Sequence, residues 1–374
     1  MKVTAIIPDR ISTPVGGMGE QFKNTYKYLK NDIEINIVGY LDKETKQENY
    51  RGVTNPLPHL LHGNLNTLWG HIEYFYEALQ YGKPDIVHSY DWTTYMAGYY
   101  LAKHFNVPLM LTVQLSAKGL ESQGLMSCVD PLTPDGQWLH KCHIEMEKFC
   151  MVNADIVTSV SKAYKKYLPP SIEKKTVVIP NGIDLPQWQS TSDVSFPGKN
   201  KFKVVYIGRF AEMKGVKHLL EAKIPKEIDL IMVGHPDGGD GSIVGRMDEL
   251  LKKQDNIFYV GPMYGQNKID MLCAADAVIM PSTHEPFGIV ALEALASKSI
   301  LLSSRVDGMG DFLNEKNSIY AEPSADGIQK AFKEFLSLSE SKKSMMVSEG
   351  IKTCKKYNWK NISKQYLNIY KSLL

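Results

Sequence analysis

Several widespread binding motifs are missing from this chain. It has neither GxGxxG nor the Walker pattern GxxxxGK[ST], which weakens a NAD(P) site and a P-loop as interpretations. Its five cysteines form no CxxC pair and no zinc-type spacing, and their odd number favours a reducing compartment. No Asp-x-Asp occurs, and Asp237-Gly-Gly-Asp240 is too widely spaced to replace it. Nothing in the sequence therefore requires a metal ion, and we expect neither metal nor cofactor.

The chain also lacks a charge excess and a long apolar run. Its 43 basic and 41 acidic residues give a formal charge of +2, so nothing demands a nucleic acid or an anionic membrane as partner. No apolar run reaches about 18 residues, which argues against a membrane span. The N-terminus, Met1–Pro8, is too short for a signal peptide and is typical of a buried strand. We therefore expect a cytoplasmic protein.

The pattern that is present predicts two α/β domains. At 374 residues the chain is too long for one ordinary core. Short β-branched runs alternate with helical patterns, as in parallel sheets covered by helices on both faces. The predicted strands are Val3–Ile7, Ile33–Val38, Ile86–His88, Leu109–Val113, Ile156–Ser159, Val177–Ile179, Lys203–Ile207, Leu230–Val233, Ile257–Val260, Ala277–Met280 and Ile300–Ser303. The helical patterns include Gly19–Leu29, Thr93–Phe105, Gly136–Asn153, Val216–Ala222, Val244–Lys253 and Lys268–Ala274.

A polar segment separates the two series of strands. Asn181-Gly-Ile-Asp184 ends the first series, residues 187–200 are polar and contain proline and serine, and strands restart at Phe202. The last segment, Trp359–Leu374, is typical of an amphipathic helix that could pack on either domain. The predicted organisation is two doubly wound Rossmann-like domains at 1–185 and 201–358, joined by a linker at 186–200.

In open α/β sheets, ligands bind beyond the carboxyl ends of the strands. The first strand leads into a glycine-rich loop with Gly16, Gly17 and Gly19, whose backbone N–H groups could approach a bound anion. The alternative is a loop that only turns the chain. The strand at Ile86–His88 leads to His88 and Asp91, for which a buried core histidine and a helix N-cap are equally good interpretations.

Two cations follow the first strand of the second half. Gly208 and Arg209 leave that strand, and Lys214 stands just before the next helix. Fixed cations together with helix amides can stabilise the negative charge of a diphosphate leaving group. Solvated surface charge is the alternative, but cations are disfavoured at a helix N-terminus unless an anion neutralises them.

The segment Glu285-Pro-Phe-Gly-Ile-Val-Ala-Leu-Glu293 contains two carboxylates eight positions apart. Pro286 suits the first turn of a helix that continues to Ala296, which would leave Glu285 in the preceding loop and Glu293 two turns inside. The backbone N–H groups between them could bind an anion. Alternatively, both glutamates only favour the positive end of the helix dipole.

Together these motifs resemble those of retaining glycosyltransferases of the GT4 type, which have the GT-B fold. The combination consists of Gly208-Arg209…Lys214-Gly215, Pro281-Ser282, the Glu285–Glu293 pair and Pro180-Asn-Gly-Ile-Asp184. The segments Gly16-Gly17, His88-x-x-Asp91-Trp92 and Glu285–Glu293 are similar to those of glycogen and starch synthases, including archaeal ones.

The resemblance implies a role for each motif. Arg209 and Lys214 would hold the donor diphosphate, Glu293 the ribose hydroxyls, and Glu285 the donor sugar. Asp91 would face the donor sugar or the acceptor, and Gln114 would lie at the reaction centre. The other residues expected to bind the donor are Gly16, Gly17, Gly208, Phe287, Gly288, Ile289 and Val290. In this family the two domains face each other across a cleft.

Two positions depart from the glycogen synthase pattern. Pro14 stands where a lysine is usual, two residues before the paired glycines, and Gln114 stands where a histidine is usual after the strand Leu109–Val113. Glutamine can hydrogen-bond a sugar hydroxyl but cannot take a proton. Front-side retaining transfer lets the departing phosphate accept the acceptor's proton, so the resemblance still implies activity.

The expected function is transfer of a hexosyl unit, glucosyl first, from a nucleoside-diphosphate sugar such as UDP- or ADP-glucose to an α-glucan. Three alternatives stay open: a lipid, metabolite or cell-surface glycan acceptor; a GT-B protein that binds a nucleotide sugar or glucan without turnover; and an epimerase, for which no clear pair of acid and base carboxylates is visible. Aromatic side chains that could stack on sugar, but fit a helix core better, are Trp92, Tyr95, Tyr99 and Trp138.

Overall fold

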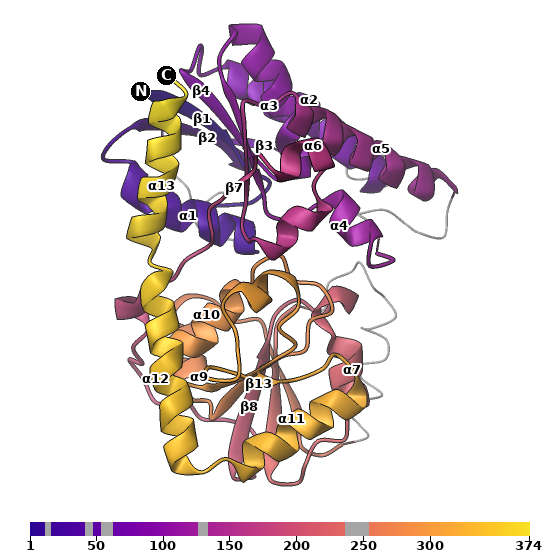
Figure 1. The fold of residues 1–374 in the computed structure, drawn as a ribbon, viewed down its shortest axis with the longest axis vertical. Helices are drawn as coiled ribbons and strands as arrows, with labels where there is room; N and C mark the ends of the chain where they lie inside the picture. The colour runs from indigo at the N-terminus through magenta and orange to yellow at the C-terminus, as the bar shows by residue number, and fades with distance from the viewer. Residues whose placement is uncertain (12–15, 42–47, 54–62, 126–133, 236–253) are drawn as a thin grey trace. The chain divides into compact units, whose positions relative to one another are not determined.

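The computed structural model describes residues 1–11, 16–41, 48–53, 63–125, 134–235 and 254–374. The chain divides into two compact units, Met1–Asn181 with Trp359–Leu374 (the first unit) and Gly182–Asn358 (the second unit) (Figure 1). The expected loop at Asp237–Asp240, the expected helix at Val244–Lys253 and Pro14 lie outside the described residues. The predicted boundaries at 185 and 200 stay predictions.

The first unit contains a seven-stranded parallel sheet in the order β3-β2-β1-β4-β5-β6-β7. Its strands are β1 (Lys2–Ile6), β2 (Glu34–Tyr40), β3 (Tyr50–Val53), β4 (Ile86–Tyr90), β5 (Leu109–Val113), β6 (Ile156–Ser159) and β7 (Val177–Val178). Its helices are α1 (Gly17–Leu29), α2 (Gly63–Leu79), α3 (Trp92–Phe105), α4 (Ala117–Glu121), α5 (Pro134–Val152), α6 (Pro170–Glu173) and α13 (Trp359–Ser372). The central strands are buried along their whole length, as their continuous apolar sequences predict.

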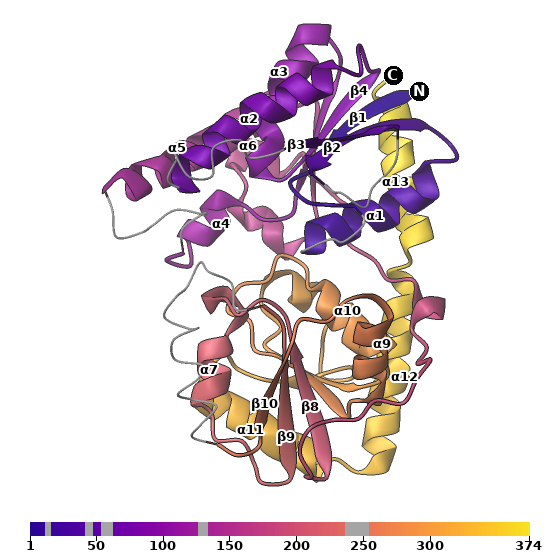
Figure 2. The ribbon, with the colours of Figure 1, turned by 180° about the vertical axis from the view of Figure 1, so that it is seen from behind.

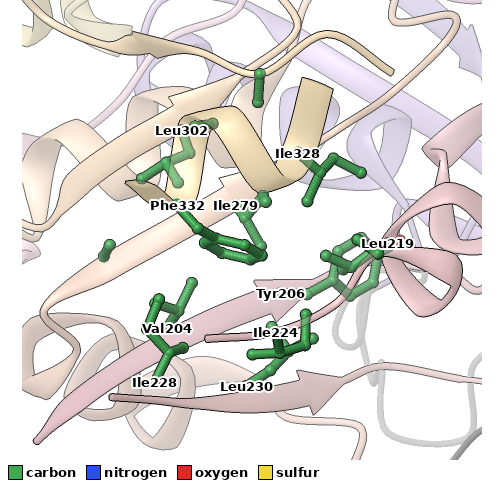
Figure 3. Close-up of a cluster of buried hydrophobic side chains, with 14 of the residues drawn as sticks. Val204, Tyr206, Leu219, Ile224, Ile228, Leu230, Ile279, Leu302, Ile328 and Phe332 are labelled. Atoms are coloured by element: carbon green, nitrogen blue, oxygen red, sulfur yellow. The ribbon is translucent and has the colours of Figure 1, made fainter. Parts of the chain in front are cut away.

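The second unit contains a six-stranded parallel sheet in the order β10-β9-β8-β11-β12-β13. Its strands are β8 (Phe202–Ile207), β9 (Ile228–Val233), β10 (Ile257–Gly261), β11 (Ala277–Met280), β12 (Ile300–Ser303) and β13 (Ile319–Tyr320). Its α-helices are α7 (Val216–Glu221), α9 (Gly265–Ala274), α10 (Ile289–Ala296), α11 (Ala325–Ser337) and α12 (Glu340–Lys356). Figure 3 shows one of its core layers, where Phe332 and Ile328 of α11 lie over strand residues such as Val204.

Both sheets are doubly wound, so the predicted α/β class of two parallel-sheet domains is confirmed. The chain moves outward from β1 to β3 and then returns to β4 on the other side of β1. It does the same from β8 to β10, returning to β11 beside β8. At such a switch point the two connections leave in opposite directions and open a crevice at the carboxyl ends of the strands. The switch points therefore lie beside Gly16 and Asp91 in the first unit, and beside Arg209 and Glu285 in the second.

The C-terminal helix α13 belongs to the first unit. It packs against α1, and its buried residues Trp359, Ile362, Tyr366 and Tyr370 join the core formed with β1 and β2. Figure 2 shows α13 beside α1. The hydroxyl of Tyr370 is 2.7 Å from His88 Nδ1, and His88 Nε2 is 2.7 Å from Thr112 Oγ1. His88 is therefore a buried core histidine, one of its two predicted interpretations.

Three local predictions were wrong. Helix α10 begins at Ile289 and not near Pro286, because Gly288 adopts a left-handed conformation with φ 96°. Glu293 consequently lies about one turn inside the helix, not two. The strands β3 and β13 were missed because they are short edge strands, and Trp138, expected in a helix core, is 62% exposed.

Candidate donor and acceptor sites

Backbone hydrogen bonds connect the loop that follows β8 with the loop that follows β11. The backbone N–H groups of Thr283 and His284 both donate to the carbonyl of Met213, at 2.9 and 3.2 Å. Gly215, next to them, has φ 69°, and a Cβ there would lie 1.9 Å from the carbonyl oxygen of Pro281. Only glycine permits this approach, which fixes the two strand exits against each other.

Lys214 and Glu285 form an ion pair across this junction. Lys214 Nζ lies 2.5 Å from Glu285 Oε2, and the two side chains are 21% and 10% exposed. Arg209 leaves the same strand end as Lys214 and is exposed. A carboxylate and two cations, predicted separately from the sequence, thus gather at one switch point.

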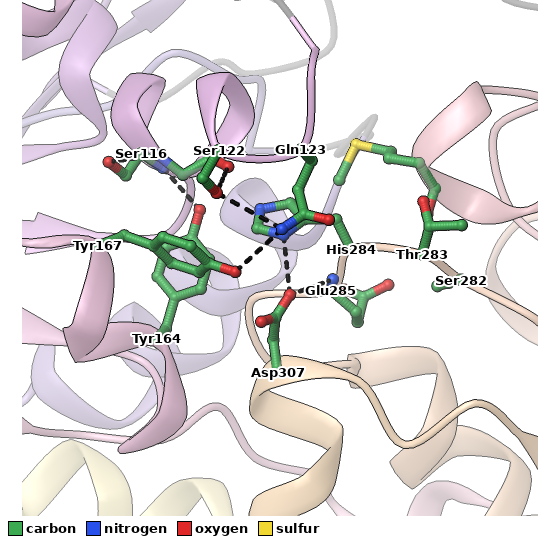
Figure 4. Close-up of polar contacts among 12 residues, drawn as sticks. Ser116, Ser122, Gln123, Tyr164, Tyr167, Ser282, Thr283, His284, Glu285 and Asp307 are labelled. Carbon is green, nitrogen blue, oxygen red and sulfur yellow. Dashed lines mark hydrogen bonds and ion pairs between the residues drawn. The ribbon is translucent and has the colours of Figure 1, made fainter. Parts of the chain in front are cut away.

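The backbone of Glu285 is held by a residue that the sequence analysis missed. Asp307, which begins the 3₁₀ helix η4 (Asp307–Asp311) beyond β12, accepts a hydrogen bond from the Glu285 N–H at 3.2 Å through Oδ2. The same oxygen lies 2.8 Å from Nδ1 of the buried His284 (Figure 4). Asp307 has φ 43°, unusual for a residue with a Cβ. Its position just after a strand was the only sequence signal available.

The start of α10 has backbone N–H groups available, so an anion site there stays a prediction. Gly288 caps the helix without a side-chain hydrogen bond, and the first N–H groups, those of Ile289 and Val290, have no acceptor within the helix. The side chain of Phe287 is buried against Phe312 and so is structural, leaving only its backbone available for a ligand.

Glu293 is the one charged residue of α10, and all its neighbours from Ala291 to Ala296 are buried. Its Oε1 lies 2.6 Å from Nζ of Lys268 in α9, a partner that the sequence analysis did not identify. Its Oε2 is buried and has no hydrogen-bond partner among the described residues. A buried carboxylate oxygen left without a donor is unfavourable, so this atom is suited to accept from a ligand hydroxyl.

Two predicted glycines use their N–H groups within the protein. Gly208 donates to the carbonyl of Val233 at 3.1 Å and so continues the ladder between β8 and β9. In the first unit, Asp9 Oδ2 accepts from Gly16 at 3.3 Å and from Gly19 at 3.1 Å, and thereby caps α1. Gly16 and Gly17 are exposed.

Asp91 follows β4 and is both an N-cap and a strained residue. Its carboxylate accepts from the Trp92 N–H at 2.7 Å, while its backbone has φ 66° and ψ 155°, a region that glycine normally occupies. It is 2% exposed. Burial, together with the nearby Glu147, raises the pKa of its carboxyl well above the ordinary value. A strained, buried carboxylate at a switch point is typical of a functional residue.

Glu147 extends this polar region from α5. Its Oε2 accepts from Ser116 Oγ at 3.0 Å and from the Lys118 N–H at 3.4 Å, and so holds the start of α4. Burial raises the pKa of Glu147 to about 8. The residue was not predicted, because its position in a charged helix resembles a solvated surface.

Gln114 follows β5 and is 7% exposed. Its side-chain amide contacts Gln21 Oε1 and lies 3.5 Å from Asn181 Oδ1, while Gln21 Nε2 donates to the Tyr366 hydroxyl at 2.7 Å. The position that holds a histidine in glycogen synthases is thus occupied by part of a buried amide network.

Two features are absent from the described residues. Among the described residues no cluster of three or more His, Cys, Asp or Glu side chains is arranged to hold a metal ion. In the same part of the chain, no helix combines the length and apolar character needed to cross a bilayer.

Comparison with known proteins matches nearly the whole chain to two glycosyltransferase families. Residues 15–187 match Glycosyltransferase Family 4, and residues 189–352 match Glycosyl transferases group 1. An uncharacterized glycosyltransferase of Methanocaldococcus jannaschii is 26% identical over 404 aligned positions, covering 99% of this chain and 97% of that protein. The glycogen synthase of Mycobacterium tuberculosis is 26% identical over 251 positions, covering 64% of this chain and 57% of that protein.

Solved structures show the same architecture. The sucrose-phosphate synthase of Thermosynechococcus elongatus superposes with a TM-score of 0.82 at 21% identity, covering 100% of this chain and 99% of that one. HepE of Anabaena, solved in complex with UDP and glucose, gives 0.76 at 16% identity and 99% coverage of both chains. The chain belongs to the GT-B glycosyltransferases, with a family 4 domain followed by a group 1 domain.

Proposed function

We propose that the protein transfers a hexosyl unit, glucosyl first, from a nucleoside-diphosphate sugar to a glycan acceptor with retention of configuration. The observation that carries this proposal is the Lys214–Glu285 pair at the β8/β11 switch point, beside Arg209 and the open start of α10. One carboxylate and two cations fit a substrate that presents sugar hydroxyls next to a diphosphate.

The proposed transfer reaction needs few groups besides Lys214, Arg209 and Glu285. The bond between the sugar C1 and the diphosphate oxygen breaks, the acceptor oxygen bonds to C1 on the same face, and the acceptor's proton passes to the departing diphosphate. Lys214 and Arg209 would neutralise the charge that develops on the leaving group. Glu285 would orient the sugar, and its ion pair already holds Lys214 in place before the donor binds.

Neither cation needs help from a metal in this scheme, so we propose that activity is metal-independent. The nucleotide ribose would bind at Glu293, and the phosphates at the N–H groups of Gly288, Ile289 and Val290. Support for a uridine donor comes from HepE, which is solved with UDP-glucose.

For the acceptor we propose an α-glucan. Relatives include proteins named glycogen synthase and alpha-maltose-1-phosphate synthase, which makes a glucan or a sugar phosphate the first acceptors to test. Asp91 and Gln114 would meet the acceptor. A GT-B protein that only binds its ligands is a second candidate, because Gln114 cannot take a proton and is held by Gln21.

The test is a matrix of donors and acceptors. UDP-, ADP- and GDP-glucose are each incubated with glycogen, with maltooligosaccharides, with glucose 1-phosphate and with no acceptor, with and without EDTA. The assay measures nucleoside-diphosphate release and label transfer, and ¹H NMR of the product reports the anomeric configuration. We expect an α-linked product and equal rates with EDTA. Binding of a nucleotide sugar without release under every condition would favour the binding protein, and a β-linked product would refute retention.

A further inference from the structure

The Lys268–Glu293 pair combines a buried contact with an unused carboxylate oxygen. Lys268 Nζ lies 2.6 Å from Glu293 Oε1, and the side chains are 18% and 6% exposed. Glu293 Oε2 is buried, and no residue in the described part of the chain hydrogen-bonds to it. Within a helix whose other residues from Ala291 to Ala296 are small or apolar and buried, this is an expensive arrangement unless a ligand completes it.

Lys268 fixes the orientation of the Glu293 carboxylate. The torsion at the end of a glutamate side chain is broad, so an unpaired carboxylate samples many orientations. With one oxygen held by Lys268, the plane of the carboxylate is set and the second oxygen points in one direction. Glu293 is buried and Lys268 is largely shielded, so the pair is less screened by solvent than an exposed ion pair.

The position of Lys268 is itself secured, because its helix is tied down two residues later. The Asp270 carboxylate accepts from the Thr191 N–H at 2.8 Å and from Ser192 Oγ at 2.7 Å. Gln266 Nε2 donates to the same carboxylate at 2.8 Å and to the Gln189 carbonyl at 3.1 Å. The segment from 189 to 192 thereby holds α9, and the Lys268 side chain leaves from a fixed backbone.

We propose that Lys268 is a positioning residue for recognition of the nucleotide ribose. It holds Glu293 so that Oε2 accepts a hydrogen bond from a ribose hydroxyl of the donor. This inference rests on the proposed function, since it needs a nucleotide at this site. Lys268 would thus contribute to nucleotide recognition from α9, outside both α10 and the Glu285–Glu293 segment.

The experiment combines one substitution in the protein with one chemical change in the ligand and compares the two effects on binding affinity. Calorimetry measures binding of UDP, ADP and GDP to the full chain. The tightest of these is then compared with its 2′,3′-dideoxy analogue, in the wild type and in Lys268→Met. We expect the substitution to weaken binding of the ribonucleotide about tenfold, and binding of the dideoxy analogue less than twofold, because only the former has hydroxyls for Glu293.

Three variants separate positioning from folding. Lys203→Met is the matched control, because Lys203 forms a comparable buried pair with Asp229 (2.5 Å, 17% and 1% exposed) at the other end of β8. It should leave both affinities unchanged. Lys268→Arg should restore ribonucleotide affinity to within about threefold of the wild type. Glu293→Gln should lose the preference for the ribonucleotide even if Lys268→Met does not fold.

Each outcome distinguishes the two proposals. Equal losses for the ribonucleotide and its dideoxy analogue in Lys268→Met, or no loss for either, would overturn the role of Lys268 while leaving the proposed function intact. A retained ribonucleotide preference in Glu293→Gln would overturn both this inference and the placement of the ribose at Glu293, while the assignments of Lys214, Arg209 and Glu285 would stand. If none of the three nucleotides binds the wild-type chain, the proposed donor site itself is wrong and this inference fails with it.

Discussion

Replacing Lys214 by methionine removes one of two cations at the β8/β11 switch point while keeping a side chain of similar length. In the ligand-free chain this ammonium lies 2.5 Å from Glu285, so it is placed before the donor arrives. Loss of a preorganised group that stabilises a leaving group typically lowers turnover about 10²–10³-fold. In the proposed site Arg209 would still face the diphosphate of the variant. We therefore expect the lower end of this range, a loss of turnover of about 10²-fold or about 2.7 kcal/mol.

The same substitution has a separate cost in stability. Glu285 is only 10% exposed, and without Lys214 its carboxylate loses its charged partner. A buried charge left unpaired costs about 3–5 kcal/mol, but Lys214 is 21% exposed and water can reach the gap. We therefore expect the free energy of unfolding to fall by about 1–2 kcal/mol, and Glu285→Gln in the same background to recover part of it.

The assay must keep the two effects apart. Initial rates of nucleoside-diphosphate release are measured at saturating donor and acceptor, at a temperature where urea titration shows the variant to be folded. Lys214→Arg keeps the charge and should retain turnover within about tenfold of the wild type. If folded Lys214→Met turned over as fast as the wild type at saturating donor, the assignment of Lys214 to the diphosphate would be refuted.

Three further predictions concern stability. Gly215→Ala should lower the free energy of unfolding in urea by more than about 2 kcal/mol, because its Cβ would lie 1.9 Å from the Pro281 carbonyl oxygen. The control is Gly261→Ala, at a residue with a similar φ but open space around it, which should lose only about 1 kcal/mol. Equal losses in the two variants would contradict the steric argument. Burial raises the pKa of Glu147 to about 8, so the folded chain keeps a proton that the unfolded chain releases above about pH 4.5. As pH rises between these values, this group should lower stability by about 1.4 kcal/mol per pH unit. Glu147→Gln should reduce the total slope by about this amount, leaving the contribution of Asp91, whose pKa burial also raises; an unchanged slope would exclude Glu147 as a source. Burial lowers the pKa of His71 to about 4, and neither of its buried ring nitrogens has a hydrogen-bond partner among the described residues. His71→Met should raise the free energy of unfolding by about 1 kcal/mol at pH 7 and reduce the loss of stability as pH falls from about 6.5 to about 4. A lower stability of the variant at pH 7 would show that the histidine is satisfied.

The residues of the proposed donor site could largely be located from the sequence because they stand at strand ends. Arg209 follows β8 and Glu285 follows β11, and the doubly wound order makes these strands neighbours. Strand periodicity therefore locates the residues, and topology brings them together. The ion pair between Lys214 and Glu285 was not predictable, because it depends on the glycine at 215 and on the hydrogen bonds that the Met213 carbonyl accepts.

Contacts between helices were beyond sequence reasoning. Lys268 reaches Glu293 because α9 and α10 cover the same sheet, and a single sequence contains no information about which lysine on one helix meets which glutamate on another. Asp9 is a similar case. It caps α1 from the end of β1 and takes the N–H groups of Gly16 and Gly19 that were expected to approach a ligand. Each contact depends on a loop path and not on a residue pattern.

Helix α5 inverts the usual rule of burial on part of its surface. Trp138 and Phe149 are 62% and 45% exposed, whereas His143 and Glu147, one turn apart, are 1% and 4% exposed. The polar pair faces inward where α5 packs against α3 and α4, and Glu147 accepts there from Ser116, the N-cap of α4. Local rules are broken chiefly where function requires it. The inverted face of α5, next to the strained Asp91, therefore supports placing acceptor recognition at this edge of the first unit, where a hydrophobic pattern alone would have predicted only packing.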